Sequence, residues 1–445
     1  MVLISQEGVP AGTVPRADPI ASSPSPDEEQ AQAITFDSRL QRRRPVVTWG
    51  LLALIVGTFG LEQYYGGSSS DATLIRMGAE VPARILSGEW WRLLAPMFLH
   101  SGWPHFLMNS FVLVSLGLFL ERLFGSARFL VLYVVSGLFG CLFGTLFAKL
   151  SGHSLSVGAS GALFGLLSAT AVLGFRPRGQ LPARLVADLK RNAVINLGLN
   201  LLVSLRPGID YLAHLGGALA GLLIVGLGVI TPTIWPREDG RPYARLLPAL
   251  GAAIAGLSLM ASLGTAIFHG QPWLLRSPLA FVRTSLGDSG LSIELPTVLG
   301  PPRSQRRSDG ATDVSAGDPL ERLMELAMVV QPMPSVGASR EEQLAIFEDN
   351  ASHYRSVALE RGAERSAEPK QLDIDGWPAL QQFLRLPDGR RLTRIDMVAH
   401  RHQIVVELRE HRSLPQNLAI NLAALLGTLR VESPLRPAAL EKPHG

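Results

Sequence analysis

Long, predominantly apolar runs occupy much of the first 270 residues of this 445-residue chain. A helix needs about 20 apolar residues to cross the hydrocarbon layer of a bilayer. Runs of this kind lie at 46–65, 103–122, 127–149, 158–175, 211–230 and 246–268, and a shorter one lies at 192–206. The pattern predicts a membrane all-α helical bundle with seven transmembrane helices. Irregular backbone exposed to lipid cannot satisfy its hydrogen bonds, so these runs limit the possible folds more than any other feature.

Positive charges flank the apolar runs unequally, and Lys and Arg accumulate on the cytoplasmic side of membrane helices. They cluster in alternate connections, at Arg39, Arg42, Arg43, Arg44, Arg122, Arg128, Arg176, Arg178, Arg184, Lys190, Arg191, Arg237, Arg241 and Arg245, whereas 150–157 holds none. This alternation predicts a cytoplasmic amino terminus and an extracytoplasmic position for everything after the seventh run. We expect an integral protein of the bacterial inner membrane.

Changes in composition divide the chain into four predicted segments. Residues 1–44 are rich in Ser, Pro, Asp and Glu and predict a disordered cytoplasmic tail. Residues 45–235 form the six-helix membrane core, and 236–269 contain a basic linker and the seventh helix. Residues 270–445 are long enough to form a separate soluble domain, for which the sequence predicts an α+β fold.

A few polar side chains lie within the apolar runs, where they are costly unless they have a function. Ser160 opens the fourth run, His214 opens the sixth, and His105 and Asn109 lie in the second. These three runs cross in the same direction, so their first turns lie at similar depth near the outer face. A neutral imidazole can take the proton of a serine hydroxyl and make it a nucleophile. His105, Asn109 and the backbone N–H of Ser160 can stabilise the oxyanion that forms, which completes a set of groups for acyl transfer.

Small residues follow both the serine and the histidine. Gly161 and Gly165 form one Gly-xxx-Gly pair, and Gly217 and Gly221 form another, which favours close approach of two helices in lipid. His214 shares one helical face with the second pair. We therefore expect the fourth and sixth helices to meet and to bring His214 to Ser160.

The remaining polar and charged residues give little support for a third catalytic residue, a metal site or nucleic-acid binding. Asp210 lies one turn before His214 but borders the water layer, so a role as an acid that orients the histidine is the less favoured interpretation. The single cysteine, Cys141, excludes an intrachain disulfide, and no metal or cofactor is predicted. The net charge of +4 reflects the inner-face arginines and does not indicate binding to nucleic acid.

The segment from about Glu89 to Gly221 resembles the rhomboid family of intramembrane serine proteases. The motifs that carry the resemblance are Trp91-Arg92, the segment from His100 to Asn109, Glu121-Arg122, Gly158-Ala159-Ser160-Gly161, and Ala213-His214 followed by Gly217 and Gly221. The resemblance implies a rhomboid-like bundle, a Ser160–His214 dyad without an acid, and an oxyanion hole that uses His105 and Asn109. It also implies that Phe164 packs on the base, that Gly158, Gly161, Gly217 and Gly221 support the site, and that the first loop lies partly in the membrane.

The main hypothesis is an intramembrane serine endopeptidase. It would cleave transmembrane or membrane-anchored proteins near the outer boundary of the bilayer through an acyl-enzyme. The alternative is a proteolytically inactive rhomboid-like protein that binds membrane clients for quality control, and a transporter is a poorer third. His105 and Asn109 have a structural alternative, in which they tie the first loop to its helix through hydrogen bonds. Purely structural roles are expected for His100, which would pin that loop, and for Trp91-Arg92, which would anchor it at the interface. Glu121-Arg122 is expected at the cytoplasmic end of a helix.

The carboxyl-terminal region shows strand and helix signals of its own. We expect a strand at 291–295, a loop over 300–319 and a helix that begins at a Ser339/Glu342 capping box and ends at about 361. Three strands are then expected at 382–386, 391–398 and 403–408, with a turn at Asp388-Gly389. A last helix is expected over about 415–430. This region weakly resembles PsbP-type domains of photosystem II. His400, His402 and His411 are interpreted as surface residues. The predicted role is a module that binds substrate or a regulatory partner.

Overall fold

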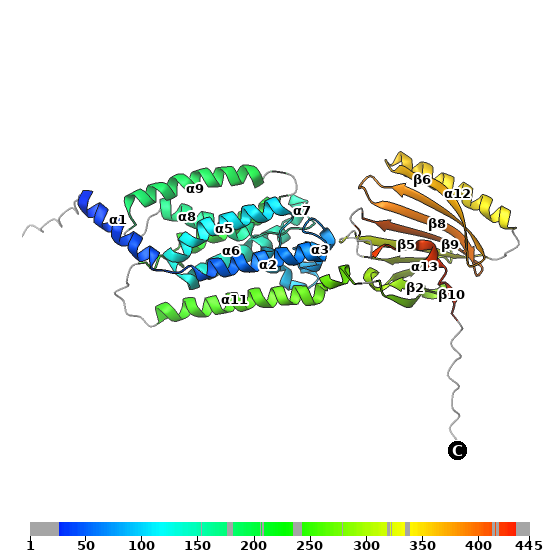
Figure 1. The fold of residues 1–445 in the computed structure, drawn as a ribbon, viewed down its shortest axis with the longest axis horizontal. Helices are drawn as coiled ribbons and strands as arrows, with labels where there is room; N and C mark the ends of the chain where they lie inside the picture. The colour runs from blue at the N-terminus through cyan, green and yellow to red at the C-terminus, as the bar shows by residue number, and fades with distance from the viewer. Residues whose placement is uncertain are drawn as a thin grey trace, which may run out of the picture.

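The computed structural model describes residues 26–152, 154–175, 181–204, 206, 209–234, 243–277, 279–317, 321, 323–333, 339–411, 414 and 418–432. These residues form a helical bundle and, beyond its last helix, a sheet-rich domain (Figure 1). Parts of the predictions fall outside the described residues: positions 1–25 of the tail, Arg176, Arg178, Arg237 and Arg241 of the basic connections, and residues 433–445.

The bundle contains eight long helices within the described residues. They are α1 (Pro26–Gln41), α2 (Val46–Tyr65), α5 (Trp103–Phe124), α6 (Ser126–Leu146), α8 (Ser160–Phe175), α9 (Ala183–Ser204), α10 (Tyr211–Gly226) and α11 (Tyr243–Gly270). In the described part of the chain, four segments are long and apolar enough to cross a membrane: Val46–Tyr65, Trp103–Phe124, Ser126–Leu146 and Leu246–Leu275. Helices α8 and α10 are apolar but shorter. Seven crossings therefore remain a prediction.

Two segments differ from what the sequence indicated. Residues 26–41 of the expected disordered tail form α1, and Phe36 on this helix is buried in the core of the bundle. Burial of one aromatic side chain favours order that the polar composition of the segment does not suggest. Helix α9 begins at Ala183, so Arg184, Lys190 and Arg191 lie within a helix rather than in a connection.

Three helices, α6, α8 and α10, pack against one another at glycines. A Cβ atom at Gly140 of α6 would lie 2.8 Å from the Ala213 carbonyl oxygen, and one at Gly216 of α10 would lie 2.7 Å from the Phe139 carbonyl oxygen. The expected pairs on α8 and α10 are joined by Gly140 on α6, where a Cβ atom would also lie 3.2 Å from the Gly161 Cα atom. Backbones this close leave no space for larger side chains.

The first loop, residues 66–102, contains α3 (Asp71–Arg76), α4 (Pro82–Leu86) and the short helices η1 (Trp90–Leu93) and η2 (Ala95–Phe98). Arg92 is buried and donates hydrogen bonds to the carbonyl oxygens of Ile75 (2.8 Å) and Ala79 (2.9 Å). The expected interfacial anchor is thus wrong for Arg92. Its guanidinium group satisfies loop carbonyls that would otherwise be buried without partners.

Glu121, expected as a plain helix end, is also buried. Its carboxylate accepts hydrogen bonds from the backbone N–H groups of Val47 (2.9 Å) and Thr48 (2.7 Å) at the start of α2, and from the Ser126 hydroxyl (2.6 Å) at the start of α6. A carboxylate at these positions satisfies N–H groups that lack partners in the first turn of a helix. Glu121 therefore joins the amino-terminal ends of two helices to α5.

The sheet-rich domain holds two antiparallel sheets. One has the order β1-β2-β10, with β1 (Phe281–Ser285), β2 (Leu291–Pro296) and β10 (Arg430–Val431). The other has the order β3-β4-β5-β9-β8-β7-β6, with β3 (Arg303–Arg306), β4 (Thr312–Ala316), β5 (Met324–Pro332), β6 (Glu364–Ile374), β7 (Trp377–Arg385), β8 (Arg391–Ala399) and β9 (His402–Glu410). Helix α12 (Arg340–Glu360) packs on β7 and β8. The capping box of α12 and the β7-β8-β9 meander confirm the sequence expectations.

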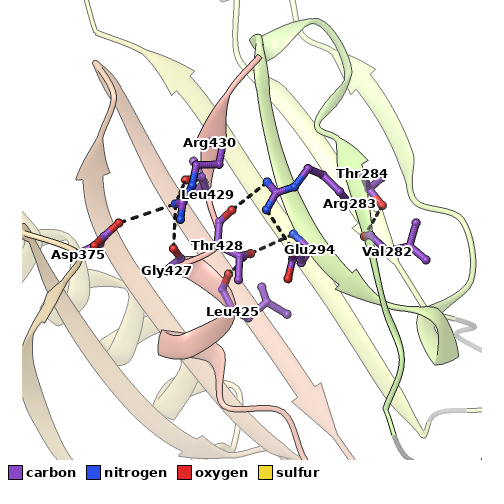
Figure 2. Close-up of polar contacts among 10 residues, drawn as sticks. All are labelled: Val282, Arg283, Thr284, Glu294, Asp375, Leu425, Gly427, Thr428, Leu429 and Arg430. Atoms are coloured by element: carbon purple, nitrogen blue, oxygen red, sulfur yellow. Dashed lines mark hydrogen bonds and ion pairs between the residues drawn. The ribbon is translucent and has the colours of Figure 1, made fainter. Parts of the chain in front are cut away.

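Two predictions in this domain are wrong. The expected loop at 300–319 contains the hairpin of β3 and β4, because Gly310 takes a left-handed conformation (φ 84°) in the turn and alternate residues of β4 are buried. Within the described residues 418–432, the last helix covers only α13 (Leu422–Leu426), and Arg430 and Val431 pair with β2. The backbone N–H of Glu294 in β2 donates to the Thr428 hydroxyl (3.0 Å), and this contact fixes the chain after α13 against the small sheet (Figure 2).

The bundle and the domain share specific contacts. Arg76 of the first loop forms an ion pair with Glu321 (3.1 Å), and Arg276 donates to the Tyr64 carbonyl oxygen at the end of α2 (2.9 Å). Helix α11 runs along the bundle and ends at the domain, whereas α2 begins at the opposite end of the bundle (Figure 1). The domain is thus attached at the end of the bundle that carries the first loop.

Candidate active site

Ser160 and His214 lie together where two helices of the bundle begin. Ser160 is the first residue of α8, and His214 lies in the first turn of α10. The His214 Nε2 atom is 2.8 Å from the Ser160 Oγ atom, which is hydrogen-bond distance. Just before Ser160, Gly158 has φ 123° and donates its N–H to the Pro96 carbonyl oxygen of the first loop (2.9 Å). The loop therefore helps to orient the serine.

The histidine ring is supported from two helices. Phe164, one turn after Ser160, stacks on the imidazole with ring centroids 4.3 Å apart and planes 14° from parallel, as the resemblance implies. At the edge of the same ring, the Nδ1 atom lies 2.7 Å from the Ser204 Oγ atom at the end of α9. Ser204 was not among the predicted site residues. Its only signal was a polar residue at the end of an apolar run.

Asp210 does not contact the imidazole through its side chain. Its carboxylate caps α10 by accepting the N–H of Ala213 (3.1 Å), and it faces Glu80 of the first loop across Gly144. The N-terminus of α10 stabilises the charge of this capping carboxylate, and the hydrogen bond to Ala213 replaces one to the imidazole. The less favoured role of Asp210 as the orienting acid is therefore wrong.

His105 and Asn109 approach the serine segment from α5. A Cβ atom at Gly158 would lie 2.7 Å from His105 Nε2 and 3.3 Å from Asn109 Nδ2, so both side chains lie directly against this glycine. The Asn109 Nδ2 group is buried and has no hydrogen-bond partner among the described residues. A buried donor without a partner is available to an oxygen atom that arrives with a substrate.

The remaining histidines have other surroundings. The backbone N–H of His100 donates to Glu62 of α2 (3.0 Å), and the His100 ring packs edge-on against His105 and Phe106 of α5, so this residue does pin the loop. His402 Nδ1 bonds to the His400 carbonyl oxygen in the other domain. Among the described residues, no three His, Cys, Asp or Glu side chains are grouped as metal ligands.

The fold and the site describe a helical membrane protein that carries a paired serine and histidine. Residues 87–230 match the family model described as Rhomboid domain. This part of the chain is a rhomboid domain, and the apolar helices make the chain an integral membrane protein.

Curated relatives share this region. The chain is 34% identical to Rhomboid protease GluP of Bacillus subtilis (strain 168) over 194 residues, 44% of this chain and 37% of that protein. It is 30% identical to Rhomboid protease AarA of Providencia stuartii over 183 residues, 37% of this chain and 65% of that protein. It is 38% identical to RHOMBOID-like protein 1 of Arabidopsis thaliana over 179 residues, 39% of this chain and 45% of that protein. The matches thus cover less than two thirds of the length of these relatives.

The carboxyl-terminal region has a weak structural likeness to the solution structure of cyanobacterial PsbP from Synechocystis sp. PCC 6803. The sequence identity is 15%, the TM-score is 0.27, and the match covers 35% of this chain and 94% of that one. At this TM-score the likeness does not define the fold of the domain.

Proposed function

We propose that this protein is an intramembrane serine endopeptidase in which Ser160 is the nucleophile and His214 the general base. The observation that carries the proposal is the 2.8 Å contact between His214 Nε2 and Ser160 Oγ at the ends of two apolar helices. A hydroxyl is a poor nucleophile until an adjacent base takes its proton. The similarity to proteins named rhomboid proteases supports the same activity.

The reaction then follows from these groups. The Ser160 Oγ atom bonds to the carbonyl carbon of the scissile peptide while its proton passes to His214 Nε2. The C–N bond breaks as the imidazolium returns this proton to the leaving amine, which leaves an acyl-enzyme. Water then attacks the ester carbon with His214 again as the base, and the serine is regenerated. Stacking against Phe164 keeps the imidazole aligned during both steps.

The oxyanion is stabilised by the backbone N–H of Ser160 and by the side chains of Asn109 and His105. The unpartnered Nδ2 group of Asn109 supports this role, because a donor that is already in position costs no reorganisation when charge develops. The contact of both side chains with Gly158 brings them within two residues of the nucleophile.

Substrates are transmembrane or membrane-anchored proteins, cleaved near the outer boundary of the bilayer. A peptide bond in a helix is protected by its own hydrogen bonds, so a cleavable segment contains Gly, Pro or other residues that weaken helices. The membrane core spans 45–235, 236–269 add the seventh helix, and 270–445 form an extracytoplasmic domain that binds substrate or a regulatory partner. The position of this domain at the end of the bundle opposite the start of α2 supports this orientation (Figure 1).

The test is incubation of the purified full chain, in detergent or liposomes, with a model single-span substrate that has Gly and Pro near its outer boundary. We expect cleavage there, and labelling of Ser160 by a fluorophosphonate probe. Ser160→Ala should show neither, while Ser262→Ala, which removes a buried hydroxyl on α11, should retain both. Equal cleavage by wild type and Ser160→Ala would overturn the proposal. Substrate binding without cleavage or labelling would favour the inactive client-binding alternative.

A further inference from the structure

Among the described residues, two side chains lie within hydrogen-bond distance of the His214 imidazole, and the proposed dyad uses only one of them. Nε2 faces Ser160 Oγ at 2.8 Å, and Nδ1 faces Ser204 Oγ at 2.7 Å. Ser204 is 3% exposed although it ends a helix. Both ring nitrogens are therefore held by hydroxyl groups from other helices, α8 on one side and α9 on the other.

We infer that Ser204 is a positioning residue that fixes the tautomer and orientation of His214, an inference that rests on the proposed function. To accept the proton of Ser160, Nε2 must be unprotonated, so the neutral ring carries its hydrogen on Nδ1. That N–H donates to Ser204 Oγ. The site is then a Ser160–His214 dyad whose imidazole is oriented by a third, neutral residue, Ser204.

A hydroxyl suits this position better than a carboxylate. A buried carboxylate requires strong compensation for its lost hydration, whereas a buried hydroxyl requires only a hydrogen bond. The nearby carboxylate of Asp210 caps α10 instead, at 3.1 Å from the Ala213 nitrogen. Ser204 thus selects the tautomer without a second buried charge next to the base.

The position of Ser204 also connects the base to α9. This helix packs mainly on α8, which carries Ser160 and Phe164. The ring is thereby enclosed by Phe164 against its face and by one hydroxyl at each nitrogen. Loss of the Ser204 hydroxyl removes one of these three constraints and leaves the other two in place.

The test compares Ser204→Ala and Ser204→Thr with the matched control Ser262→Ala in the full chain. A net hydrogen bond of about 1.4 kcal/mol corresponds to about tenfold in rate, so Ser204→Ala should lower kcat about tenfold with KM nearly unchanged. Ser204→Thr keeps the hydroxyl and should restore most of kcat, and the control should match wild type. The rate of fluorophosphonate labelling at Ser160 should follow kcat.

A spectroscopic measurement separates this inference from the proposed function. Nitrogen NMR of histidine-labelled protein should show His214 protonated at Nδ1 in wild type and in Ser204→Thr, and a mixture of tautomers in Ser204→Ala. This holds even if the wild type cleaves no substrate, a result that would overturn only the proposed function. Unchanged kcat and an unchanged tautomer in Ser204→Ala would overturn the role of Ser204, as would a loss of kcat that Thr does not restore.

Discussion

Gly217 of α10 lies directly against the carbonyl oxygen of Gly161 of α8, so that a Cβ atom at Gly217 would overlap it. The same relationship is repeated one turn further along, between Gly221 and Gly165. Because the atoms in contact belong to the backbone, no side-chain rotation can make space for a Cβ atom, and a larger residue at Gly217 or Gly221 must push α10 away from α8. The distance between Ser160 and His214 therefore depends on glycine at positions that take no part in the chemistry.

Gly217→Val is expected to lower stability and activity together. A branched side chain must push α10 away from α8, and overpacking of this kind costs typically about 1–3 kcal/mol. Thermal unfolding and substrate cleavage should be measured on the same preparation. His214→Ala is the comparison, since it should abolish cleavage with little change in Tm. A Gly217→Val variant that melts like wild type would contradict the close contact of the two helices.

Asn109→Ala should lower kcat by a factor of about 10²–10³, the usual effect of removing one oxyanion donor. The fold should be retained, because Asn109 Nδ2 has no hydrogen-bond partner in the described part of the chain. Ser110→Ala is the matched control, as it removes an equally unpartnered buried group from the next residue. If both variants keep full kcat, Asn109 has no part in stabilising the oxyanion.

The ion pair between Arg76 and Glu321 should couple the first loop to the carboxyl-terminal domain. Their side chains are 13% and 10% exposed, so a double-mutant cycle with Arg76→Met and Glu321→Gln should give a coupling energy of about 1–3 kcal/mol in thermal unfolding. The exposed pair of Arg365 and Glu368 is the control and should give less than about 0.5 kcal/mol. Equal coupling in the two pairs would show that the loop and the domain are not docked through Arg76.

Reporter fusions on either side of α11 test the predicted seventh crossing. A reporter active only outside the cytoplasm should be active when fused after Glu432 and inactive when fused after Thr233, because α11 lies between them and is long and apolar enough to cross. The glycines of α11 cost about 1 kcal/mol each in helix propensity, which burial of its apolar residues in lipid outweighs. Activity of a cytoplasm-only reporter after Glu432 would place the carboxyl-terminal domain inside the cell.

Elements stabilised by residues close in the sequence were predicted correctly, whereas those stabilised by residues distant in the sequence were not. The meander of β7, β8 and β9 and the capping box of α12 depend on neighbours within a few residues, and both were predicted. The hairpin at 303–316 was missed, because its composition is typical of a loop, whereas the burial of alternate β4 residues and the pairing of β4 with β5 arise only in the folded domain. Arg92 was placed at a lipid interface because its partners, the carbonyls of Ile75 and Ala79, carry no signal in the sequence.

The sequence by itself determined the apolar helices and the candidates Ser160 and His214, because hydrophobic length and a polar group in an apolar run are local properties. It also indicated that α8 and α10 approach closely, through glycines repeated at helical spacing. Only the tertiary structure decided which group faces His214 Nδ1. That choice between Asp210 and Ser204 depends on how the end of α9 packs against the first turn of α10, which no periodicity encodes.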